Sequence, residues 1–412
     1  MDCNLALRFR EQNRENQRYL PKLGEGDILE FIKFRLDEIK KNNLYRNLSY
    51  VSTPQNKYCI INGVNMLVMS SNSYLGLSDN EHVKQAAINA IKRYGVSAGG
   101  SRFSTGSYDV HRTLEQQIAS FKGKPSAVLF NSGYMANIGV IPAICTEEFT
   151  IFCDERNHTS SHDACRLARG RTVYYKHSDI NDLYQKVKDN QSKRGMIVTD
   201  SVFNMEGDIA NLPDIVSIAK QFHLYTLVDD SHATGVIGET GRGIGEYFGL
   251  TKEIDLITGT FGKALASEGG FVAGDSIVCD YIRNTANTFR ATTPNSPSST
   301  AAAIKALEIV KAHPELVEKL RENVRYFVSG LHEIGFSRVN TKSAIVSLII
   351  GEECRAIKFS ELLYNKGIYV PTILYPSVAK GQARLRFTLM ATHDRDELDF
   401  VIRHIKSIRD SI

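Results

Sequence analysis

The stretch that decides the fold is LITGTFGKALASEGGFVAG, residues 256–274. It predicts two short β-strands with Lys263 on the turn between them, next to Gly262 and near the hydroxyl of Thr260. A lysine amine flanked by small residues becomes a Schiff-base nucleophile when burial or a neighbouring cation lowers its pKa. The glycine also lets a planar ligand approach the backbone. An ordinary loop lysine fits this stretch equally well, so other segments must decide between the two interpretations.

Two upstream stretches bear on that choice. The first, LYTLVDDSHATGVIG (224–238), predicts an apolar strand that runs into Asp229 and His232. A strand that ends in a carboxylate places that group at the edge of an α/β sheet where ligands bind, although both side chains could instead only cap the following turn. The second, SAVLFNSGYMANIGVI (126–141), predicts a strand that breaks at Ser132 and Gly133 before a helix, whose free N–H groups would face an anion.

These three fragments together fit one cofactor, pyridoxal 5'-phosphate (PLP). PLP needs a lysine for its aldehyde, a carboxylate that keeps its pyridine nitrogen protonated, and an anion site for its phosphate. Lys263 would supply the first and Asp229 the second. The turn at Ser132 and Gly133 would supply the third, and His232 would hydrogen-bond the ring hydroxyl. The protonated ring would then act as an electron sink for a carbanion at the α-carbon of an amino acid.

Motifs along the chain resemble those of the α-oxoamine synthases, PLP enzymes of fold type I. In order they are SGYMAN, DERNH, VDDSHATGVIGETGRG, TGTFGKA and KGQARLRFTLMATH. The resemblance covers roughly residues 30–410 and is strongest to 8-amino-7-oxononanoate synthase and its glycine C-acetyltransferase relatives. It implies an α/β fold of the type I PLP-dependent transferases, with a mainly parallel central sheet flanked by helices and a small C-terminal α+β domain.

The pattern of the chain predicts the same architecture. Apolar strand candidates alternate with helical stretches from residue 127 to 271, which indicates a mainly parallel sheet with helices on both faces. Residues 27–41 have helical periodicity and predict an amphipathic entry helix, and residues 57–69 predict a hairpin turned at Asn62 and Gly63. We expect three parts: an N-terminal arm and helix (1–55), a large PLP-binding domain (56–290) and a small C-terminal domain (291–412).

The composition excludes several classes of protein. The 412 residues are 42% hydrophobic and 23% charged, as in ordinary globular proteins. The net charge of +4, with scattered basic residues, argues against nucleic acid as a partner. Because we find no signal-peptide core and no apolar run of about 20 residues, we expect a cytoplasmic protein without a membrane span. Seven scattered cysteines without a CxxC pair indicate neither a disulfide framework nor a metal site.

The resemblance assigns roles to further residues. It places Asn72 near the substrate carboxylate, although Asn72 could instead cap a turn. It stacks His158 on the pyridine ring, whereas the sequence alone favours a structural histidine there. Tyr134, in SGYMAN, and Thr260, in TGTFGKA, join the cofactor-binding residues. Thr292 matches a hydroxyl that reaches the phosphate of a second subunit, which implies a homodimer, although the tandem proline usual in that segment is absent.

An arginine is expected to bind the carboxylate of the amino-acid substrate. Arg384 and Arg386 alternate by two in ARLRFTLM and so share one face of a strand. One guanidinium would clamp the amino-acid carboxylate while the other pairs structurally, and the resemblance selects Arg386. Two departures bear on the substrate, because Asn204 stands where relatives usually have Ser and Ser231 where they commonly have Ala. The amide of Asn204 would still hydrogen-bond the cofactor hydroxyl or the substrate carbonyl, in an altered pocket.

The resemblance implies an enzyme that condenses a small amino acid with an acyl thioester, from acyl-CoA or an acyl-carrier protein, to give an α-amino ketone, CO2 and a free thiol. Lys263 would remove the α-proton. L-alanine is favoured, while glycine or serine, the acyl length, and a biotin or a specialised pathway stay open. The rivals are an aminotransferase or aldolase on the same fold and a non-catalytic partner subunit, and the intact Lys263 argues against the partner subunit.

Overall fold

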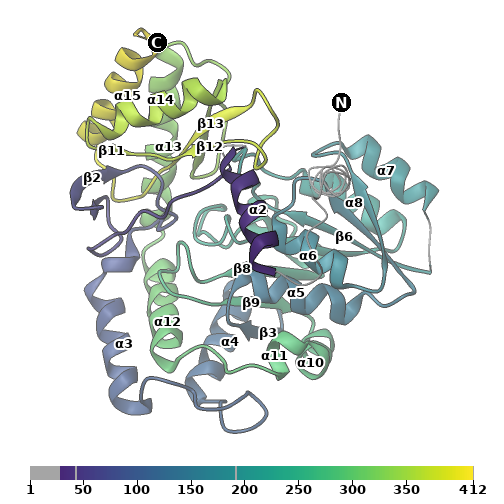
Figure 1. Cartoon of the computed structure of the whole chain (residues 1–412). Coiled ribbons are helices and arrows are strands. Elements are labelled where there is room, and N and C mark those ends of the chain that lie inside the picture. The colour runs from purple at the N-terminus through teal and green to yellow at the C-terminus, as the bar shows by residue number, and fades with distance from the viewer. Residues whose placement is uncertain (1–27, 42–43, 191–192, 412) are drawn as a thin grey trace.

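The structure, a computed structural model, describes residues 28–41, 44–190 and 193–411. A central sheet lies between helices, and a second group of strands and helices forms the C-terminal end of the molecule (Figure 1). The predicted entry helix is confirmed as α2 (Ile28–Lys41), whereas the expected arm before it lies outside the described residues. No helix in the described ranges combines the length and the apolar character needed to cross a membrane.

The central sheet confirms the predicted alternation of strands and helices. Its seven strands lie in the order β3-β9-β8-β7-β6-β4-β5. All neighbours pair in parallel except β9, which is antiparallel to both β3 and β8. Lys263 therefore lies on the turn that joins the parallel strand β8 to the antiparallel strand β9. The bounds are β3 (Ser126–Phe130), β4 (Phe149–Asp154), β5 (Arg171–Tyr175), β6 (Arg194–Asp200), β7 (Tyr225–Asp229), β8 (Leu256–Thr260) and β9 (Gly270–Gly274).

Helices cover both faces of this sheet. Successive residues of a strand point to opposite sides, so one strand can contact both layers of helices. Val198 of β6 packs with α5, α6 and α10, whereas its neighbour Ile197 packs with α7 and α8 on the other face. The strands accordingly read as nearly continuous apolar runs, as expected for a sheet buried on both sides. These helices are α5 (Gly133–Ile144), α6 (Thr159–Leu167), α7 (Ile180–Asp189), α8 (Leu212–Gln221) and α10 (Ser276–Thr285).

A long helical layer connects the central sheet to the C-terminal part. α3 and α12 run beside each other and α4 lies against β3 (Figure 1). Their buried faces share one apolar core with the C-terminal helices and strands, so the two parts of the molecule are packed together. The bounds of these helices are α3 (Glu81–Tyr94), α4 (Asp109–Phe121) and α12 (Pro297–Ala312). Three further helices are α9 (Ile244–Tyr247), α11 (Asn287–Arg290) and α13 (Glu315–Glu333).

The C-terminal part is α+β, as predicted. One sheet has the order β10-β13-β12, and α14 and α15 pack against it. The predicted N-terminal hairpin is confirmed, with Asn62 and Gly63 at φ 49° and 84°, and its strand β2 pairs in parallel with β11. The domain boundaries at 55/56 and 290/291 stay predictions. The bounds are β1 (Tyr58–Ile61), β2 (Val64–Val68), β10 (Ile345–Gly351), α14 (Glu353–Tyr364), β11 (Ile368–Tyr369), β12 (Thr372–Ile373), β13 (Ala383–Thr388) and α15 (Arg395–Arg409).

Candidate active site

Two carboxylates meet at the C-terminal edge of the central sheet. Asp200 ends β6, Asp229 ends the adjacent β7, and the two are partners in the strand register. Asn137 Nδ2 donates to Asp229 Oδ2 at 2.6 Å, and the backbone N–H of Ser231 donates to Oδ1 at 2.9 Å. Burial raises the pKa of the Asp200 carboxyl well above its usual range, and the Asp229 charge adds to the rise. Burial thus favours the protonated form of Asp200, while Asn137 and the backbone of Ser231 fix the orientation of the Asp229 side chain.

Lys263 is electrostatically coupled to this edge. Burial lowers the pKa of its amine to about 8, and the Arg386 guanidinium contributes to the decrease. The carboxylates of Asp229 and Asp200 oppose it. An amine with this pKa is partly neutral near neutral pH, which is the state that attacks an aldehyde.

Both predicted histidines belong to the same cluster. His158 caps α6, its backbone N–H donates to Asp200 Oδ2 at 2.9 Å, and its Nδ1 lies 2.8 Å from Ser160 Oγ. Burial lowers the pKa of His158 although Asp229 opposes the shift. Burial, with the charge of Lys263, also holds the pKa of His232 well below its usual range. Both imidazoles are therefore neutral at neutral pH.

The predicted anion turn lies beside the end of β8. Ser132 caps α5, and its Oγ accepts a backbone N–H of the first helical turn at 3.1 Å. A Cβ added at Gly133 would lie 3.2 Å from Thr260 Cβ and 3.4 Å from Ser231 Oγ, so a larger residue here would crowd Thr260 and narrow the space beside this helix end. Thr260 Oγ1 accepts from the backbone N–H of Gly262, which ties this cradle to the Lys263 turn.

Two other predicted cofactor residues have hydrogen-bond partners outside the cluster. Tyr134 packs edge-on against His158 with 6.1 Å between ring centroids, and its hydroxyl donates to Asp163. Thr292 Oγ1 donates to the carbonyl of Thr293 at 3.3 Å. The predicted role of Thr292 requires a second copy of the chain, so it stays a prediction.

The two arginines of β13 have different partners. Arg386 donates from Nε to the carbonyl of Asn204 at 2.6 Å and from Nη2 to the Oδ1 of Asn204 at 2.7 Å. Arg384 instead donates to the carbonyl of Met205 at 3.2 Å and pairs with Glu206 at 3.5 Å. Both arginines therefore bond to the loop of residues 202–209, and Arg386, whose charge also lowers the pKa of Lys263, is the one that faces the cluster. The side chain of Asn204 is thus directed at Arg386.

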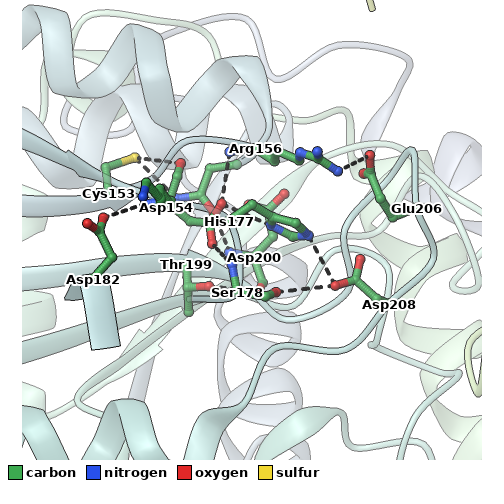
Figure 2. A network of polar contacts seen from close by, with 12 residues as sticks. Cys153, Asp154, Arg156, His177, Ser178, Asp182, Thr199, Asp200, Glu206 and Asp208 are labelled. Atoms are coloured by element: carbon green, nitrogen blue, oxygen red, sulfur yellow. Dashed lines mark hydrogen bonds and ion pairs between the residues drawn. The ribbon is translucent and has the colours of Figure 1, made fainter. Parts of the chain in front are cut away.

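The loop that carries Asn204 is anchored to the large sheet by a histidine. Figure 2 shows His177 between Asp154 and Asp208, with Nδ1 3.1 Å from Asp154 Oδ1 and Nε2 3.2 Å from Asp208 Oδ2. Burial alone would lower the pKa of His177, but these hydrogen-bonded carboxylates outweigh it and raise the pKa to about 9. The imidazolium therefore holds one end of the loop of residues 202–209 to strand β4 of the large sheet.

Sequence reasoning missed three residues of the cluster. Tyr74, fully buried, has its hydroxyl 2.7 Å from His232 Nδ1 and 3.2 Å from Asn72 Oδ1. Asn137 holds Asp229 and lies within the SGYMAN motif, which gives no sign of this contact. Asp200 ends a predicted strand just as Asp229 does, so the same rule would have found it.

The donor set of this cluster fits PLP. It combines an amine of lowered pKa with a fixed carboxylate and two neutral imidazoles. The capped helix end next to Gly133, where a Cβ would fill the cradle, suits a phosphate.

Known proteins support this assignment. Residues 64–405 match the family "aminotransferase class I and II". A putative 8-amino-7-oxononanoate synthase of Desulfovibrio desulfuricans is 48% identical over 89% of this chain and 95% of its own length. The 8-amino-7-oxononanoate synthase of Lysinibacillus sphaericus is 44% identical over 90% of this chain and 96% of its own. A solved structure of serine palmitoyltransferase (SPT) with PLP has a TM-score of 0.89 at 26% identity, covering 94% of this chain and 99% of that one.

Proposed function

Because this chain belongs to the α-oxoamine synthases of the aminotransferase class I and II family, we propose that it joins L-alanine to an acyl thioester, with acyl-CoA as the donor. The products would be an α-amino ketone, CO2 and the free thiol. The α-carbon of the amino acid bonds to the acyl carbon, the C–S bond breaks, and the carboxyl group leaves as CO2. The observation that carries the proposal is Lys263, with its pKa of about 8, coupled to Asp229 at the sheet edge.

At the cofactor end, each residue has a defined task. PLP, when bound, supplies an electron sink that stabilises a carbanion at the α-carbon. Lys263 would bind the aldehyde and, as a neutral amine, take the α-proton. Asp229, oriented by Asn137, would keep the pyridine nitrogen protonated. His158 would lie against the ring, and the capped helix end at Ser132 and Gly133 would bind the phosphate.

At the substrate end, Arg386 would bind the carboxylate of the amino acid together with Asn72. Asn204 occupies the edge of the guanidinium formed by Nε and Nη2. The edge formed by Nη1 and Nη2 offers a second pair of donors, which matches the two oxygens of a carboxylate. Asn204 would thus set the orientation of Arg386 without blocking it.

A serine palmitoyltransferase-like reaction, with L-serine and a long acyl thioester, is the second candidate. It is favoured by the TM-score of 0.89 to SPT, whereas sequence identity favours the 8-amino-7-oxononanoate synthases. A glycine C-acetyltransferase-like reaction would use the same residues. A homodimer and a cytoplasmic location stay predictions. The homodimer is supported by the exposed apolar side chains of α2, among them Ile28, Leu29 and Ile32.

The test is an absorbance titration of the PLP-loaded protein with glycine, L-alanine and L-serine, followed by acyl-CoA donors of increasing length with thiol release as the readout. We expect the largest spectral change with L-alanine and thiol release that depends on both substrates. Lys263→Ala is the control and should release no thiol. Formation of a keto acid without thiol release would overturn the proposal in favour of transamination.

A further inference from the structure

Tyr74 is a buried phenol that touches both ends of the candidate site. It follows β2 in the segment SSNSYLG, and its side chain is fully buried. Its hydroxyl lies 2.7 Å from His232 Nδ1 and 3.2 Å from Asn72 Oδ1. The Arg386 guanidinium is close enough for its charge to oppose the rise in the pKa of Tyr74 that burial causes. One oxygen atom thus connects the histidine at the cofactor end to two residues at the substrate end.

The contact with His232 decides which ring nitrogen carries the proton. His232 is neutral, since burial and nearby cations hold its pKa well below the usual range, and a neutral imidazole has one N–H. Burial raises the pKa of Tyr74 to about 12, so the phenol keeps its proton. The short contact is to the imidazole nitrogen, a stronger acceptor than the amide oxygen of Asn72. Tyr74 therefore donates to Nδ1, and the proton of His232 stays on Nε2.

The oxygen of Tyr74 remains free to accept. The charge of Arg386 acts on this hydroxyl, while Nε and Nη2 of Arg386 donate to Asn204. Asn204 therefore holds the guanidinium through two hydrogen bonds, and the lone pairs of the Tyr74 oxygen add a favourable electrostatic interaction with its charge. A phenylalanine would keep the packing of the ring and lose both the donor to His232 and the oxygen that interacts with the charge of Arg386.

We propose that Tyr74 is a positioning residue that fixes the Nε2–H tautomer of His232 for the ring hydroxyl of PLP and keeps its own oxygen, as an acceptor, near the charge of Arg386, which would bind the carboxylate of the amino acid. The inference rests on the proposed function for the identity of these two ligands. Its first part, the tautomer, concerns only this chain's own residues.

The experiment compares Tyr74→Phe with Tyr175→Phe, which removes a similarly buried phenol from β5. Protein labelled with 15N-histidine reports the tautomer of His232, assigned by the signal lost in His232→Gln. We expect the Nε2–H tautomer in the wild type and in Tyr175→Phe, and a shift toward a mixture in Tyr74→Phe. The dissociation constant for L-alanine, from the spectral titration, should rise about tenfold only in Tyr74→Phe.

Several results would overturn the inference. An Nδ1–H tautomer in the wild type would do so without any variant, which covers the case in which Tyr74→Phe does not fold. Equal changes in Tyr74→Phe and Tyr175→Phe would show a structural effect only, and an unchanged affinity for L-alanine would exclude a role of the Tyr74 oxygen at Arg386. If the wild type releases no thiol but the tautomer depends on Tyr74, the proposed function fails while this part of the inference stands.

Discussion

Asn204 and Arg386 form a two-point contact, with the carbonyl and Oδ1 of Asn204 accepting from Nε and Nη2 at 2.6 and 2.7 Å. The contact joins a loop of the large sheet to the strand of the C-terminal part that faces the site. It also gives a physical role to the residue at which this chain departs from the Ser usual in its family. The side chain of Asn204 supports the predicted carboxylate-binding arginine.

The Asn204→Ala variant should weaken amino-acid binding more than turnover. The variant loses the side-chain hydrogen bond to Arg386 and keeps the one from Nε to the backbone carbonyl. Because a hydrogen bond to a charged group contributes about 1.5–3 kcal/mol and the retained bond still orients the guanidinium, we expect KM for the amino acid to rise roughly tenfold. The measurement is steady-state kinetics with a saturating acyl thioester. Asn284→Ala, at the exposed end of α10, is the control. An unchanged KM would mean that Arg386 is held without Asn204.

Asp229→Asn should reduce kcat at least about 100-fold while leaving the fold intact. The amide keeps the shape of the carboxylate but cannot stabilise a proton on the pyridine nitrogen. Turnover and melting temperature are measured on the same preparation. Asp255→Asn is the matched control, because Asp255 lies before β8 and accepts from the backbone of Thr226. Turnover close to the wild-type value would exclude Asp229 as the partner of the ring nitrogen.

Lys263→Met should stabilise the protein at pH 7 when PLP is removed. The folded-state pKa of about 8 lies below the unfolded value of 10.5, so the folded state disfavours the charged amine. This cost, on the order of 1–3 kcal/mol, is fully present below pH 8 and disappears as the pH rises toward 10.5. Thermal melts from pH 6 to 10 should show the advantage of the variant shrinking with pH. A constant difference would contradict the lowered pKa.

His177→Gln should destabilise the protein in a pH-dependent manner. The pKa of His177 is raised to about 9 in the folded state, so its stabilisation is complete below about pH 6.5 and is lost as the pH rises through 9. We expect a lower melting temperature than the wild type at pH 6 and little difference at pH 10. His313→Gln, at the exposed end of α12, is the control. If the two curves are parallel, His177 does not act through its charge.

The sequence predicted the parts of the site that depend on one local stretch. A strand that ends in Asp229 and a lysine between two strands are readable because parallel topology brings strand ends to one edge. Tyr74 and Asn137 were missed because their partners are 158 and 92 residues away along the chain. The orientation of Asn204 was unreadable for the same reason, since 182 residues separate it from Arg386. Side-chain contacts of this kind follow from packing that no local pattern encodes.

The parallel pairing of β2 with β11 has a consequence for synthesis of the chain. Leu67 and Val68 find their partners in Ile368 and Tyr369, near the other end of the sequence. At about 5–20 residues per second, the ribosome makes the hairpin tens of seconds before its partner strand exists. Until then the apolar edge of β2 stays unpaired and is open to chaperones or to wrong strands. The Asn72 and Tyr74 segment, which leads directly out of β2, would therefore be among the last parts of the site to become ordered.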